Sequence, residues 1–169
     1  MYLDTSVLVK LYVTEPDSAE CERVVEGHPI LSSELAYAEL WSALLAKERS
    51  GVLSPENRQR IWELFEVHLL DRVIELVALD SEVVRDGAEL MAQVHPGVPL
   101  RTLDALPLAT FAGVDAGPLF TVDRRMLAAA RLLGYPLVHR SVYTAATAEQ
   151  AGAPAPEALA HYGGQTSSR

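Results

Sequence analysis

Hydrophobic and polar positions along the chain form two alternating patterns. Short apolar runs of strand length are separated by longer segments in which apolar residues recur every three or four positions, as on one face of a helix. Strands that alternate with helices form parallel sheets with helices packed on their faces. We therefore expect an α/β fold with a central parallel sheet of about five strands. The predicted strands are Tyr2–Leu3, PILSS from Pro29, VIELVAL from Val73, PLFTV from Pro118 and PLVHR from Pro136.

The segments between these runs predict helices, because signals for helix ends accompany their apolar periodicity. Ser54 followed by Pro55 is typical of a helix start, and Gly51 stands where the end of the preceding helix favours a left-handed residue. One helix is expected directly after the first strand. The other predicted helices span residues 17–27, 33–51, 54–69, 80–94, 103–113 and 123–134.

Composition indicates one globular domain followed by a tail. The chain has 169 residues, of which 49% are hydrophobic and 22% charged, and this supplies enough apolar material for a packed core. Residues 144–169 are rich in Ala, Gly and Pro and contain few large apolar side chains. We expect a folded domain over residues 1–143 and a flexible tail over residues 144–169.

Cysteine usage and charge narrow the classes of protein. Cys21 is the single cysteine, which excludes a disulfide framework and a cysteine-rich zinc site and fits a reducing compartment. Because there is no export leader and no apolar run of membrane length, we expect a cytoplasmic protein with no membrane partner. The net charge of −9 argues against a protein that coats nucleic acid. It argues less against an enzyme, since bound cations offset a local acidic cluster.

Two aspartates occupy equivalent places in the predicted elements. Asp4 ends the first strand, Asp123 ends the strand that begins at Pro118, and each opens a helix. The carboxyl ends of parallel strands lie at one edge of a sheet, where such sheets bind ligands. Aspartate is also a common helix cap, and capping alone is a sufficient explanation for either residue taken singly.

Glu39 and Asp104 are the other candidate acids. The residues three and four positions from Glu39 on its helix are small or apolar, and a carboxylate in such surroundings is expected to have a cationic partner, a proton or a metal ion. A core salt bridge with Arg101 is the simpler alternative. Asp104 lies in or near the first turn of its helix, where the helix dipole favours a carboxylate, so capping also explains this residue.

Together the four acids favour a metal site. Carboxylates without cysteine or closely spaced histidines are the hard oxygen ligands of a magnesium or manganese ion. Magnesium commonly reaches phosphate oxygens, so the indicated chemistry is phosphoryl transfer or hydrolysis. The chain lacks a glycine-rich phosphate loop and a serine nucleophile elbow. A haloacid-dehalogenase-like phosphatase needs a second aspartate two residues after Asp4, where Ser6 stands.

Four segments carry a family resemblance over roughly residues 1–142: YLDTSVLVKLY, SSELAYAELWSALL, LRTLDALPLATFA and LFTVDRRMLAAARLLGYPLV. In order and spacing they resemble the PIN-domain ribonucleases, in particular the VapC-like toxins of bacterial toxin–antitoxin pairs. The resemblance implies a three-layer α/β/α fold and an acidic pocket that holds magnesium or manganese. The pocket acids that it implies are Asp4, Glu39, Asp104 and Asp123, with Thr5, Ser6 and Thr121 as neighbours.

The resemblance also implies a function. Members of this family are endoribonucleases that an antitoxin holds inactive and that often form dimers, so we expect RNA, a cognate antitoxin and a second copy of the chain as partners. Arg124 and Arg125 are candidate phosphate contacts, with a solvated first helical turn as the alternative. Pro107 stands where many relatives have histidine, and we expect this departure to alter the rim of the pocket. The alternative function is a catalytically silent PIN-like module that binds RNA or protein.

Overall fold

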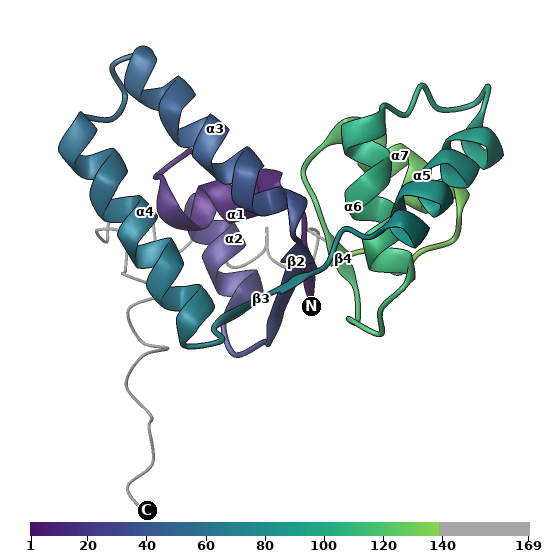
Figure 1. Cartoon of the computed structure of the whole chain (residues 1–169), viewed down its shortest axis with the longest axis horizontal. Coiled ribbons are helices and arrows are strands. Elements are labelled where there is room, and N and C mark those ends of the chain that lie inside the picture. The colour runs from purple at the N-terminus through teal and green to yellow at the C-terminus, as the bar shows by residue number, and fades with distance from the viewer. Residues whose placement is uncertain (139–169) are drawn as a thin grey trace, which may run out of the picture.

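A computed structural model of the chain describes residues 1–138, which contain seven helices and four strands (Figure 1). The longest of these helices has 16 residues, and no helix within residues 1–138 combines the length and the hydropathy needed to cross a membrane. The elements in chain order are β1 (Tyr2–Leu3), α1 (Thr5–Tyr12), α2 (Ser18–Val25), β2 (Ile30–Ser33), α3 (Leu35–Arg49), α4 (Pro55–Leu70), β3 (Ile74–Val77), α5 (Ser81–Val94), α6 (Thr102–Ala112), β4 (Leu119–Phe120) and α7 (Arg124–Leu132).

The strands form one parallel sheet in the order β3-β2-β1-β4. In its register, Tyr2 lies beside Leu31 on one side and Leu119 on the other. The fifth predicted strand is reduced to an isolated parallel bridge between Leu137 and Leu119. The prediction of about five strands was therefore one strand too many for residues 1–138. The rest of that segment and the predicted tail over residues 144–169 lie outside the described residues.

The sheet lies between two helical layers. Neighbouring residues of a strand point to opposite faces of a sheet. Accordingly, Leu3 and Phe120 pack with residues of α1 to α4 in one hydrophobic core, whereas Tyr2 and Leu119 pack with residues of α5 to α7 in the other. Figure 1 shows α1 to α4 on one side of the strands and α5 to α7 on the other. The three-layer α/β/α architecture is confirmed.

Pro107 belongs to the packing of α6 and not to the pocket. It is the sixth residue of the helix and is buried, and it has no N–H to bond to the carbonyl of Leu103, one turn earlier. Its own carbonyl accepts a hydrogen bond of 2.8 Å from Tyr2 Oη, which ties α6 to β1. Pro107 is not among the residues that line the pocket described below, so it does not itself form the pocket rim.

A buried histidine between α1 and α4 makes the fold sensitive to acid. His68 is 5% exposed, and its Nδ1 lies 2.7 Å from Tyr12 Oη. Burial lowers the pKa of His68 below the ordinary value of 6.5, and the nearby Asp71 charge opposes this shift only partly. The folded chain therefore takes up this proton less readily than the unfolded chain, and stability is lost as the pH falls through the ordinary histidine range.

We expect the free energy of unfolding of the wild-type protein to fall between pH 7.5 and pH 5.5 in urea titrations. His68→Gln lacks the imidazole that takes up a proton more readily in the unfolded chain. Its free energy of unfolding is therefore expected to fall less over the same pH interval. The matched control is His28→Gln, because His28 is exposed. An acid slope that is equal in the wild type and in His68→Gln would contradict the assignment.

Candidate functional site

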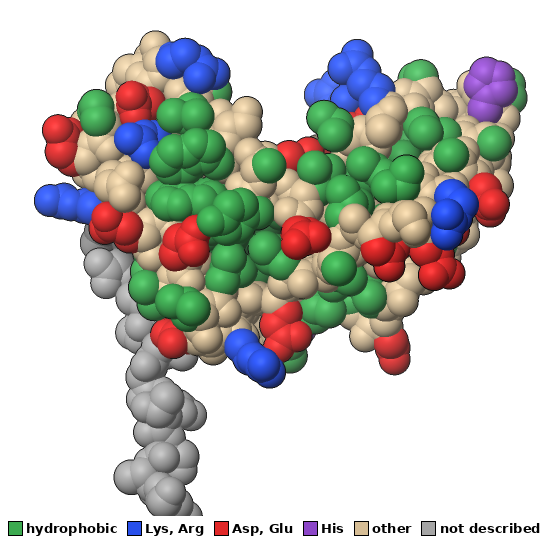
Figure 2. Space-filling view, in the orientation of Figure 1, with side chains coloured by type: hydrophobic (Ala, Val, Ile, Leu, Met, Phe, Trp, Pro, Cys, Tyr) green, Lys and Arg blue, Asp and Glu red, His purple; other side chains and the backbone are tan. Residues whose placement is uncertain are grey.

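A pocket of about 460 Å³ opens where β1 and β4 end. Its walls come from the starts of α1 and α7 and from residues of α3 and α6. Figure 2 shows the surface hollowed between the α3–α4 side and the α5–α7 side, with acidic side chains at the bottom of the hollow. The structure therefore brings together four predicted acids from distant parts of the sequence: Asp4, Glu39, Asp104 and Asp123.

Asp4 is the most buried of these acids, with 6% of its surface exposed. Its extended backbone ends β1, and its carboxylate caps α1 by accepting from the N–H of Ser6 at 3.3 Å. The same oxygen, Oδ2, also accepts from the hydroxyls of Ser6 and Thr121, the latter at 2.9 Å. Burial raises the pKa of Asp4, the charge of Asp123 adds to this effect, and the hydrogen bonds oppose it. Asp4 is thus both a helix cap and a pocket residue.

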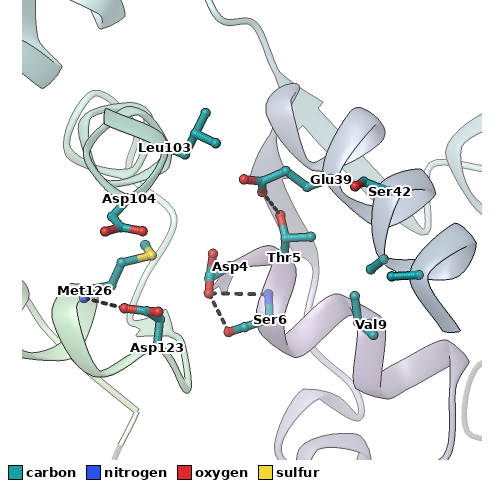
Figure 3. Close-up of a pocket in the computed structure, with 12 residues that line it drawn as sticks. Asp4, Thr5, Ser6, Val9, Glu39, Ser42, Leu103, Asp104, Asp123 and Met126 are labelled. Atoms are coloured by element: carbon teal, nitrogen blue, oxygen red, sulfur yellow. Dashed lines mark hydrogen bonds between the residues drawn. The ribbon is translucent and has the colours of Figure 1, made fainter. Parts of the chain in front are cut away.

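Glu39 projects from α3 toward Asp4 (Figure 3). The Thr5 hydroxyl donates a hydrogen bond of 2.5 Å to Glu39 Oε2, which fixes the carboxylate at the pocket wall. Burial raises the pKa of Glu39, and the charges of Asp4 and Asp104 raise it further, while the Thr5 hydrogen bond opposes them. Within residues 1–138 Glu39 forms no ion pair, so the alternative of a salt bridge with Arg101 was wrong.

Asp123 repeats the arrangement of Asp4 at the start of α7. Its Oδ1 caps the helix by accepting from the N–H groups of Arg125 at 2.7 Å and Met126 at 3.0 Å. Its own N–H donates to Thr121 Oγ1 at 3.0 Å, and that hydroxyl in turn donates to Asp4. Thr121 therefore connects the two strand-end aspartates, which places the two caps beside one another at the same edge of the sheet.

Asp104 lies in the first turn of α6 and is held by protein donors. Its Oδ2 accepts from the N–H of Arg101 at 3.1 Å, as expected for an acid at the start of a helix. Arg125 reaches across from α7 and donates to both carboxylate oxygens, with Nε at 2.6 Å and Nη2 at 3.4 Å. The Asp104 side chain is 14% exposed and the Arg125 side chain 34% exposed, so this ion pair is partly shielded from water.

The two candidate phosphate contacts have different surroundings. Arg124 is exposed on the first turn of α7, and no ion pair of the described residues includes it. Arg125 is instead engaged with Asp104, and this contact raises the pKa of its guanidinium further. A solvated first turn therefore describes the position of Arg124 but not that of Arg125.

Sequence reasoning missed the wall of the pocket. The small residues three and four positions after Glu39, which are Ser42 and Ala43, were considered only as the surroundings of that carboxylate. Both line the pocket together with Ala46, and Ala43 also packs against the hydrophobic core. A small-residue stripe beside a carboxylate was the available signal for an open wall. The other lining residues that were not predicted are Val9, Leu103 and Met126, and those of the stripe are Ser42, Ala43 and Ala46.

The chemistry of the pocket fits a hard divalent cation. Its polar lining consists of carboxylate and hydroxyl oxygens, which are the donors that magnesium and manganese prefer. Within residues 1–138, however, no three Asp, Glu, His or Cys side chains are gathered closely enough to hold an ion in this geometry. Arg125 holds Asp104 on its side of the pocket, and the charges of Asp4 and Asp104 make the ionised form of Glu39 less favourable. An ion held by three of these carboxylates would need them closer together than they are in this structure.

Glu39→Gln is expected to stabilise the metal-free protein at neutral pH. The pKa of Glu39 is raised in the folded chain, so its ionised form is less favourable there than in the unfolded chain. In the wild type this cost is fully present above the raised pKa, and it disappears as the pH falls from that pKa to the ordinary value of 4.5. In excess chelator, thermal denaturation should give Glu39→Gln a higher melting temperature at pH 7.5 and a smaller advantage at pH 4.

The matched control for this experiment is Glu89→Gln, at an exposed position of α5. It should change neither the melting temperature nor its pH dependence. An equal or lower melting temperature for Glu39→Gln at pH 7.5 would show that the Glu39 carboxylate is not unfavourable in the folded chain.

Comparison with known proteins assigns the chain to a family. A family model described as PIN domain matches residues 1–132, which include all four pocket acids. Ribonuclease VapC46 of Mycobacterium tuberculosis (strain ATCC 25618 / H37Rv) is 39% identical over 141 residues, which cover 82% of this chain and 95% of that protein. Ribonuclease VapC47 of Mycobacterium tuberculosis (strain CDC 1551 / Oshkosh) is 28% identical over 142 residues, which cover 80% of this chain and 93% of that protein. The chain belongs to the PIN domain family, as a VapC-like member.

Proposed function

We propose that this chain is a metal-dependent endoribonuclease and the toxin component of a toxin–antitoxin pair. The observation that carries the proposal is the convergence of Asp4, Glu39, Asp104 and Asp123 on one pocket at the carboxyl edge of the sheet. Asp4, Asp104 and Asp123 also have local structural roles at the starts of α1, α6 and α7. Those roles do not require the three helix starts to lie at one pocket. The 39% identity to a protein named as a ribonuclease supports RNA as the substrate.

The pocket acids would hold one or two magnesium or manganese ions. The chemistry that such an ion supplies is activation of a water molecule and stabilisation of the charge that develops on a phosphodiester. The hydroxyls of Thr5, Ser6 and Thr121 orient the carboxylates of Glu39 and Asp4 for this task, since each donates a hydrogen bond to one of their oxygens. The second oxygen of each carboxylate points toward the pocket (Figure 3).

Basic side chains near the pocket would position the RNA. Lys and Arg side chains stand on both sides of the acidic hollow in Figure 2. Arg124 is exposed at the start of α7, directly after Asp123, and is the proposed contact to a phosphate beside the cleaved bond. The net charge of −9 makes long-range steering toward RNA weak, so these local contacts carry the recognition of the backbone.

The proposal includes two protein partners and a location. Membership of the VapC-like group supports a cognate antitoxin that blocks cleavage and a homodimer of the chain. An RNA substrate and a single cysteine at Cys21 are consistent with a cytoplasmic protein.

The ends of the products test the proposed chemistry. The purified full chain is incubated with total cellular RNA and with magnesium, manganese or excess chelator. Attack by water on the phosphorus leaves a phosphate on one fragment and a hydroxyl on the other, whereas attack by the neighbouring 2′-hydroxyl leaves a cyclic phosphate. We expect defined fragments with magnesium or manganese, none in chelator, and no cyclic phosphate ends.

Other outcomes would overturn the proposal in different ways. Cyclic phosphate ends, or fragments that persist in chelator, would exclude water activation by a metal ion. RNA binding without fragments in either metal would favour a silent PIN-like binding module.

A further inference from the structure

The protein supplies a positively charged partner for some of the four pocket carboxylates but not for others. Asp104 accepts from the Arg125 guanidinium twice and from the N–H of Arg101 once. The donors that the structure describes for Asp4 and Glu39 are hydroxyl groups and one backbone N–H, none of them charged. The Asp104 side of the pocket therefore contains the fixed positive charge of Arg125. On the other side, the carboxylates of Asp4 and Glu39 have no positively charged partner among the described residues.

The guanidinium of Arg125 lies between two of the acids. Its Nη2 is 3.4 Å from Asp104 Oδ1 and 3.9 Å from Asp123 Oδ2, while Nε is 2.6 Å from Asp104 Oδ2. A cation that bridged Asp104 and Asp123 would have to occupy the same space. In sites with two metal ions the ions lie about 3.5 to 4 Å apart and share neighbouring carboxylates. Arg125 would therefore compete with a second ion for the carboxylates of Asp104 and Asp123.

The position of Arg125 is fixed by the fold. Its backbone N–H donates to Asp123 Oδ1 at 2.7 Å, so the cap that starts α7 also sets the origin of the Arg125 side chain. Because the guanidinium is attached to the chain, its effective concentration beside Asp104 and Asp123 is high. An ion from solution has to compete with it for these carboxylates. A guanidinium keeps its charge at every pH at which the protein is folded, so this competition does not weaken in alkali.

We propose that Arg125 replaces a second metal ion, so that the pocket binds a single divalent ion on the side of Asp4 and Glu39. This inference rests on the proposed function, because it concerns the ion that the proposed reaction uses. Arg125 is a positioning residue in this account: it holds Asp104 and neutralises the Asp104–Asp123 side of the pocket. Removing its charge should open that side to a second ion.

The test measures how many manganese ions the full chain binds, without any use of RNA. Calorimetric titration with manganese alone should give one ion per chain for the wild type and two for Arg125→Ala. Electron paramagnetic resonance should show isolated ions in the wild type and spin-coupled pairs in Arg125→Ala, a signature that general loosening of the structure does not produce. Arg125→Lys retains the positive charge and should restore one ion per chain.

Arg131→Ala is the matched control, because Arg131 is an exposed residue in the last turn of the same helix. It should bind one ion, as the wild type does. Two ions in the wild type, or one ion in a folded Arg125→Ala protein, would overturn the inference while leaving the proposed nuclease function intact. No bound manganese in the wild type would overturn both. A wild type that binds one ion but cleaves no RNA would contradict the proposed function alone.

Discussion

Asp4→Asn is expected to lower the rate of RNA cleavage about a thousandfold while the chain stays folded. Charge stabilisation by a catalytic metal ion is worth several kcal/mol, and a thousandfold loss corresponds to about 4 kcal/mol of transition-state stabilisation. Asn retains the oxygen that caps α1, and caps made by Asn and Asp are of similar strength. The substitution therefore removes a charge from the pocket without removing the start of the helix. Cleavage of one defined RNA under single-turnover conditions measures the loss.

Asp80→Asn is the matched control for this experiment. Asp80 caps α5 in the same way, by accepting from the N–H groups of Glu82 at 2.9 Å and Val83 at 3.0 Å, but it is exposed and does not line the pocket. It should cleave RNA at the wild-type rate. If Asp4→Asn and Asp80→Asn reduce cleavage equally, then Asp4 acts only as a cap and the account of the pocket is wrong.

Manganese or magnesium is expected to raise the melting temperature by about 5 to 10 °C. An ion at a hundred times its dissociation constant stabilises a folded protein by about 2.7 kcal/mol, and each kcal/mol shifts the melting temperature of a chain of this size by about 2 to 4 °C. The physical cause is relief of the unfavourable charge on Asp4 and Glu39, whose pKa values are both raised in the metal-free chain. Thermal denaturation with metal and with excess chelator measures the difference.

The same substitutions separate binding at the pocket from binding elsewhere. Asp80→Asn should retain the full stabilisation by metal, whereas Asp4→Asn should lose most of it, since the most buried ligand is gone. Stabilisation of equal size in Asp4→Asn would place the ion outside this pocket.

The sequence was sufficient to predict most of the fold, because periodicity and end signals act locally. The start of α4 has the predicted Ser54 cap and Pro55, and Gly51 has the predicted left-handed backbone with φ of +77°. The predicted fifth strand was the exception. An apolar run at the edge of a sheet forms a strand only where the neighbouring strand, here β4, is long enough to pair with it. β4 has two residues, and Leu119 pairs with Leu137 in a single bridge.

Sheet topology was sufficient to bring together two of the four pocket acids, whereas the place of Glu39 and Asp104 in the same pocket was predicted from the family resemblance. Asp4 and Asp123 follow parallel strands, so their meeting at one edge follows from the order of the elements. The contact between Arg125 and Asp104 did not follow, because it depends on how closely the starts of α6 and α7 approach each other. Local sequence patterns contain no information on that distance, and Arg125 was therefore assigned to phosphate or to solvent.

The measurement that tests the central claim most directly is a double-mutant cycle between Asp4 and Asp123. These residues cap different helices, α1 and α7, and Asn can serve as either cap. If the acids form one catalytic centre, their effects on the cleavage rate should be non-additive, because the residues act as a unit. The double variant with both Asp4→Asn and Asp123→Asn should then cleave RNA at about the rate of the slower single variant. If the two losses multiply, the aspartates act independently, and the claim that they form one metal-dependent centre is contradicted.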